Sequence, residues 1–231
     1  MSLALSPEEI AAVRTSLVVG VRAVAVALPL AVLTALALVR GRFPGRGVLN
    51  AAAHAPLVLP PVVVGYLLLL AFGIHGPLGA LLDRWFGMRL VFTSAGASLA
   101  AGVMAFPLMV RAVALSLDAV DPKLEEAARS LGAGALDRFC TITLPLAAPG
   151  VLAAAIVGFA ACLGEFGAVI TFAANVPGQT QTLPLAIYAA LQAPGGDAAA
   201  VRLAILSLTI AVVALAAAEA VARGARRRVG P

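Results

Sequence analysis

The sequence has few charged residues and few cysteines, and both shortages exclude classes of protein. Asp, Glu, Lys and Arg make up 12% of its 231 residues, whereas 62% are hydrophobic, a balance that soluble domains rarely reach. Its two cysteines have no metal-binding or redox spacing. A disulfide is not expected, because Cys140 falls in a polar segment and Cys162 in an apolar run. The composition predicts a polytopic membrane protein of a single domain, residues 12–222.

Sequence motifs of catalysis and nucleotide binding are also missing. The chain has no G-x-x-x-x-G-K-[ST] loop, no H-E-x-x-H and no His/Cys/Glu cluster with metal-ligand spacing. We therefore expect no enzymatic activity, no cofactor and no metal. Energy for any active process must come from a partner. The net charge of +5 does not indicate nucleic acid, because the basic residues lie dispersed at the ends of apolar runs, where membrane lipid is the expected partner.

Five apolar runs are long enough to predict membrane spans. The expected spans are residues 16–39, 56–72, 93–117, 148–172 and 201–221. The second contains Pro60-Pro61, which denies backbone hydrogen bonds and predicts a break or kink. Leu185–Gln192 is apolar but too short to span, so we expect a re-entrant or interfacial helix there.

The distribution of basic residues predicts the orientation of these spans, because cytoplasmic loops are enriched in Lys and Arg. The expected topology places the N-terminus outside and the C-terminus in the cytoplasm, with residues 118–145 and a basic tail at 223–231 also inside. On the inside fall Arg40, Arg42, Arg46, Arg111, Lys123, Arg129, Arg138, Arg223, Arg226, Arg227 and Arg228, and on the outside Arg14, Arg84, Arg89 and Arg202.

The polar segment 118–145 contains the pattern of a short helix followed by a turn. Asp121-Pro122 is a typical helix start, and Gly132 suits the left-handed residue that ends one. Between them, apolar side chains recur on one side, and Glu125 precedes Arg129 by four residues in the order that favours an ion pair. The apolar positions are Leu124, Ala127, Ala128 and Leu131.

This segment resembles the EAA signature of ABC-importer permeases. The matching residues are Glu126, Ala127, Ala128, Gly132, Ile142, Leu144 and Pro145. The resemblance implies that the segment is a cytoplasmic coupling helix that docks into a groove of an ATPase subunit. Small alanines allow a close helix approach, Glu126 is available to pair or cap at the interface, and the glycine permits the turn.

Four further stretches resemble molybdate ABC-transporter permeases: 54–66, 106–112, 164–168 and 175–182. The resemblance implies an all-α polytopic membrane protein with the type I ABC importer transmembrane fold. It also implies a homodimer that binds two cytoplasmic ABC ATPase subunits and an extracytoplasmic molybdate-binding protein in a bacterial inner membrane. The expected cargo is molybdate or tungstate.

Two alternative functions remain open at this point. Sulfate and thiosulfate permeases are similar in the EAA and Gly164–Ala168 segments, but they typically carry an additional N-terminal span. A stand-alone secondary transporter would need inverted repeats and mid-membrane carboxylates, and the sequence shows neither.

Candidate pathway or gate residues are Glu165, Thr171, Ser98 and Thr141. Glu165 is an intramembrane carboxylate and so a functional candidate. A structural or gating role is favoured over cargo contact, because a carboxylate repels an anion.

Overall fold

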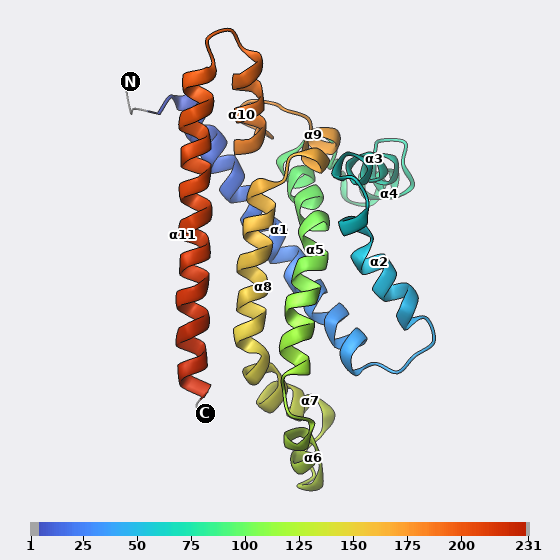
Figure 1. Ribbon diagram of the computed structural model, residues 1–231. Helices are drawn as coiled ribbons and strands as arrows, with labels where there is room; N and C mark the ends of the chain where they lie inside the picture. Colours follow the sequence, from blue (N-terminus) through green and yellow to red (C-terminus); the bar gives the residue numbers. More distant parts are fainter. Residues whose placement is uncertain (1–4, 230–231) are drawn as a thin grey trace.

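Helices of very different lengths make up the chain (Figure 1). The computed structural model describes residues 5–229. The helices are α1 Pro7–Arg40, α2 Arg46–Val58, α3 Pro61–Phe72, α4 Pro77–Phe86, α5 Ser94–Asp118, α6 Pro122–Ser130, α7 Ala135–Arg138, the π-helical segment η1 Phe139–Thr143, α8 Leu144–Gly164, α9 Gly167–Ala173, α10 Leu183–Gln192 and α11 Asp197–Val229. The last two residues of the predicted tail lie outside this range.

The helices long and apolar enough to cross a membrane agree with the expectation of about five spans. Within residues 5–229 there are four such helices, or five if α2 and α3 together form one span. These two are bent by 119° at Leu59 and Pro60, where the paired prolines predict a break. The predicted span 56–72 therefore contains a bend, and its first helix begins earlier, at Arg46.

The fourth span differs from the predicted range 148–172. It is one helix from Ala135 to Gly164, and the chain turns at Glu165 before the separate helix α9. Within it, η1 contains a wide turn in which the Leu144 N–H donates to the Phe139 carbonyl. Such a π-turn lets the helix continue into Pro145, which has no N–H to donate.

Small side chains allow the central helices to approach closely. α1, α5 and α8 pack together, and α1 crosses behind the other two in Figure 1. The buried faces are rich in alanine, and small residues are the usual means of close packing between helices in lipid. These alanines are Ala23, Ala27, Ala31 and Ala35 of α1, and Ala97, Ala100, Ala101 and Ala105 of α5.

Polar contacts fix the last two helices against the first. Arg202 of α11 forms an ion pair with Glu9 of α1 at 2.9 Å, and Glu9 is only 5% exposed. The Leu183 N–H at the start of α10 donates to the Ser16 hydroxyl at 2.6 Å. These contacts lie at the end that holds the start of α1, whereas α6 and α7 lie at the opposite end (Figure 1).

Candidate functional site

Helix α6 begins and ends where the sequence predicts. The Lys123 N–H donates to the Asp121 carboxylate at 2.9 Å, and Pro122 occupies the first helical turn. At the other end Gly132 has a φ of +88°. The Ala133 N–H donates to the Ala128 carbonyl and the Gly132 N–H to that of Arg129, both at 3.0 Å. This is a Schellman termination, which satisfies the last carbonyls of the helix.

The residues of the EAA pattern lie at this projecting end of the molecule, on α6, η1 and the start of α8. Most of them are exposed, and Ala128 and Ile142 are half-buried. Two leucines of the same turn, Leu131 and Leu136, are 89% and 76% exposed. On the predicted apolar side of α6, Leu124, Ala127 and Leu131 are exposed and Ala128 is half-buried, so most of that side does not pack against its own chain.

An ion pair that the sequence did not indicate joins α6 to α1. Arg40, the last residue of α1, lies 3.0 Å from the Glu125 carboxylate, and the same oxygen accepts a hydrogen bond from the buried Thr143 hydroxyl at 2.6 Å. Arg40 also donates to the Leu117 carbonyl at 3.4 Å. The expected Glu125–Arg129 pair is therefore wrong: Glu125 bonds instead to Arg40 of α1 and Thr143 of η1.

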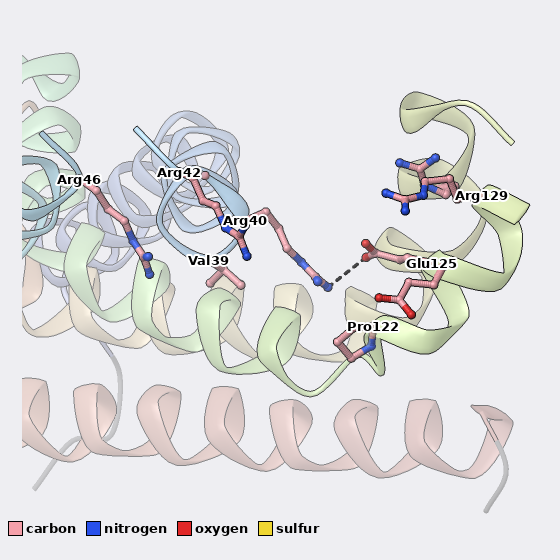
Figure 2. Close-up of a pocket in the computed structure, with 10 residues that line it drawn as sticks. Val39, Arg40, Arg42, Arg46, Pro122, Glu125 and Arg129 are labelled. Carbon is pink, nitrogen blue, oxygen red and sulfur yellow. Dashed lines mark ion pairs between the residues drawn. The ribbon is translucent and has the colours of Figure 1, made fainter. Parts of the chain in front are cut away.

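A cavity of about 680 Å³ opens beside this ion pair. Figure 2 shows Arg40, Arg42 and Arg46 on one side of it and Glu125 and Arg129 of α6 on the other. Arg138 of α7 also lines it and donates to the Ala133 carbonyl at 2.8 Å. The arginines come from segments far apart in the sequence, and only the fold brings them together.

The four pathway candidates do not converge on one site. Glu165 accepts a hydrogen bond from the Ala168 N–H at 2.8 Å and so caps α9. The hydroxyls of Ser98, Thr171 and Thr141 each donate to a carbonyl four residues earlier in their own helix. Thr141 is exposed beside α7, at the opposite end from α9. Their proposed role in a pathway stays a prediction.

Comparison with known proteins identifies the family. A model of the family described as "Binding-protein-dependent transport system inner membrane component" matches residues 27–227. The chain belongs to this family. It is therefore a multi-pass inner-membrane permease, and its several apolar helices are long enough for multiple spans.

Individual relatives refine this assignment. The chain is 51% identical to the molybdenum transport system permease protein ModB of Escherichia coli K12, over 98% of this chain and 99% of that protein. It is 47% identical to ModB of Haemophilus influenzae, over 96% of this chain and 97% of that protein. The sulfate transport system permease protein CysT of Escherichia coli K12 is 38% identical over 69% of this chain and 57% of its own length.

Solved structures of ABC transporters share the fold. A bacterial transporter that imports the acidic polysaccharide alginate superimposes with a TM-score of 0.71, covering 96% of this chain and 80% of that chain at 18% identity. At that identity the likeness concerns the fold, which is that of type I ABC importer permeases.

Proposed function

We propose that this chain is the membrane-spanning subunit of an ATP-driven molybdate importer. The observation that carries the proposal is 51% identity with a molybdenum permease over nearly the whole of both chains. The sulfate permease matches a smaller part of both chains at lower identity, so sulfate is the second candidate. Tungstate, an oxyanion of the same charge and shape, is the expected competing cargo.

The complete importer is proposed to contain two copies of this chain, two ATPase subunits and an extracytoplasmic binding protein. One solved relative is an alginate transporter in complex with a periplasmic protein, which supports an assembly of this kind. In the proposed topology, with the N-terminus outside the cell, the start of α1 faces outside and α6 faces the cytoplasm. ATP binding would shift the equilibrium between two conformations of the permease. The size of this shift is limited by the difference in free energy with which the ATPase binds the two conformations.

The proposed point of ATPase contact is the segment 118–145. Glu126, Ala127 and Gly132 are exposed on it, and the exposed Leu131 and Leu136 add apolar surface that a partner would bury. The Arg40–Glu125–Thr143 contacts give this segment a fixed position relative to α1 and α8. Movement of the ATPase would thus be passed to spanning helices.

Glu165 is proposed to maintain the turn between α8 and α9 rather than to bind cargo. Its carboxylate accepts from the Ala168 N–H, and its negative charge disfavours a nearby oxyanion.

Substitutions in the coupling segment test its role. Glu126→Arg or Gly132→Val should uncouple ATP hydrolysis from uptake without preventing membrane insertion. Both variants are assayed in vesicles for ATPase activity, molybdate uptake and amount of inserted protein. Normal uptake per ATP in both would contradict the assignment of the segment.

Uptake of radiolabelled molybdate tests the function itself. Vesicles contain this chain with its ATPase and binding protein, and excess sulfate or tungstate is added as competitor. ATP-dependent uptake that tungstate blocks and sulfate does not is the expected result. Block by sulfate would move the assignment to sulfate permeases, and uptake without the ATPase would contradict an ABC importer.

A further inference from the structure

The corner between α1 and α2 places arginines at the edge of the membrane. The apolar helix α1 ends at Arg40 and α2 begins at Arg46, so Arg42 and Arg46 lie where hydrocarbon meets the headgroup layer. From the other side, Arg129 lines the same cavity (Figure 2), and Arg138 of α7 is also among its lining residues. The cavity therefore receives guanidinium groups from both sides of the α1–α6 junction.

The charges that line the cavity do not cancel. Arg40 and Glu125 neutralise each other in their ion pair. Four arginines remain (Arg42, Arg46, Arg129 and Arg138) against the single carboxylate of Glu126, so the net charge of the lining is +3. Within residues 5–229 none of these four arginines forms an ion pair. Guanidinium groups bind phosphate in a two-pronged geometry, so a phosphate-bearing anion suits this space.

A second, smaller cavity lies beside α2 and shares the lining residue Arg46 with the first. It measures about 310 Å³ and is lined by Leu38, Arg46, Gly47 and Asn50, so Arg46 borders both cavities. The outward side of α2 is apolar: Val48 is 73% and Val58 86% exposed. A ligand with its anionic group at Arg46 therefore has polar space beside Asn50 and an apolar helix face beyond it. This sequence of surfaces matches a phospholipid.

We propose that the cavity binds the headgroup of an anionic phospholipid of the cytoplasmic leaflet, with its phosphate held by Arg42 and Arg46. The exposed Leu131 and Leu136 do not line the cavity and stay available to the ATPase. The site rests on the proposed orientation, in which this corner faces the cytoplasm, and it does not depend on which oxyanion is transported. The bound lipid would fill the space between α1 and the coupling segment.

Lipid selectivity in nanodiscs tests the site. The permease is purified with its ATPase into phosphatidylcholine nanodiscs, and trace spin-labelled phosphatidylglycerol or phosphatidylcholine reports the protein-bound fraction by electron spin resonance. The wild type should prefer phosphatidylglycerol roughly tenfold, since each interfacial arginine attracts anionic lipid. Arg42→Gln/Arg46→Gln should lose most of this preference. Arg42→Lys/Arg46→Lys should keep part of it, because charge remains but the two-pronged geometry does not.

Matched controls separate this site from other sources of selectivity. Arg14→Gln/Arg84→Gln removes the same charge at the opposite end and should keep the wild-type preference. Equal preference in the wild type and in Arg42→Gln/Arg46→Gln would overturn the site. Displacement of the labelled lipid by inorganic phosphate would contradict a lipid site and show that the cavity binds a soluble anion. A preference for phosphatidylglycerol that appears only after the ATPase is removed would contradict the lipid site, because it would show that the ATPase covers this surface in the complex. None of these readouts requires transport, so a failed uptake assay leaves this test intact.

Discussion

At the scale of single residues, Glu125 has two bonds of different strength. Its pair with Arg40 is partly exposed, with 32% and 26% of the two side chains accessible, and such pairs contribute about 0.2–1 kcal/mol. The Thr143 hydroxyl is buried, and a hydrogen bond to a charged group contributes about 1.5–3 kcal/mol. Thr143 is therefore expected to hold α6 more firmly than Arg40 does.

We predict that Thr143→Val lowers molybdate uptake per ATP hydrolysed several-fold, and more than Arg40→Gln does. The valine keeps the volume and removes the bond that fixes the position of α6. Thr209→Val is the matched control, because its hydroxyl is exposed and bonds within its own helix. Both activities are measured in vesicles at equal protein. A larger effect of Arg40→Gln would show that the order of the two bonds is wrong.

The backbone of Gly132 gives a second prediction at this scale. At a φ of +88°, a Cβ costs about 1–2 kcal/mol of backbone strain. A Cβ at either Gly132 or Gly134 would meet no neighbouring atom, and Gly134 has a φ of −67°. Gly132→Ala should therefore reduce coupling, while Gly134→Ala should not. The two variants are compared in the same uptake and ATPase assays. Equal effects would indicate that the added Cβ collides with the ATPase, rather than that it strains the backbone.

At the scale of elements, α3 and α9 touch through a glycine. A Cβ at Gly65 would lie 2.7 Å from the Ala168 carbonyl oxygen and 2.8 Å from the Thr171 Cβ. Gly65→Ala should therefore destabilise the protein by about 1–3 kcal/mol through overpacking. Gly164→Ala, where a Cβ would meet nothing within 4 Å, is the control. Thermal unfolding in detergent should give a Tm several degrees lower for Gly65→Ala only. Equal Tm values would show that α3 and α9 can move apart to accommodate the added Cβ without loss of stability.

Elements also show how far the sequence predicts this structure. The limits of α6 follow from Asp121 and Gly132, because capping depends on a few adjacent residues. The predicted span 148–172 runs past the end of the helix at Gly164, because the apolar residues continue beyond Glu165 and hydropathy does not register the turn. The Glu125–Arg40 pair was not predictable, because the partner of Glu125 depends on how α1 packs. The arginine cavity is hidden in the sequence for the same reason.

At the scale of the whole molecule, the Glu9–Arg202 pair connects the first helix to the last. Glu9 is 5% exposed and without Arg202 would keep only the hydrogen bond from the Ser6 N–H, so the loss is expected to cost up to about 3–5 kcal/mol, the penalty of an unpaired buried charge. Arg202→Gln should therefore lower the Tm, and Glu9→Gln/Arg202→Gln should recover part of the loss because no buried charge remains. Unfolding in detergent measures both, and a double variant less stable than the single one would contradict this explanation.

The two native cysteines report the orientation of the whole chain. Cys140 is exposed within η1, whereas Cys162 is buried. In the proposed topology, a membrane-impermeant maleimide should label Cys140 in inside-out vesicles and not in intact cells. Cys140→Ser should remove the signal. Labelling from the outer side would contradict the proposed topology.

The unbroken helix from Ala135 to Gly164 has a mechanical consequence. Its 30 residues extend about 45 Å at 1.5 Å per residue. In the proposed topology the Ala135 end faces the cytoplasm, and if the helix pivots there as a rigid rod, a tilt of about 10° displaces the far end by roughly 8 Å over that length. Glu165 and α9 lie at that far end. A small rotation of the proposed ATPase partner would thus be amplified, by leverage alone, into a movement of roughly 8 Å at the opposite end of this helix.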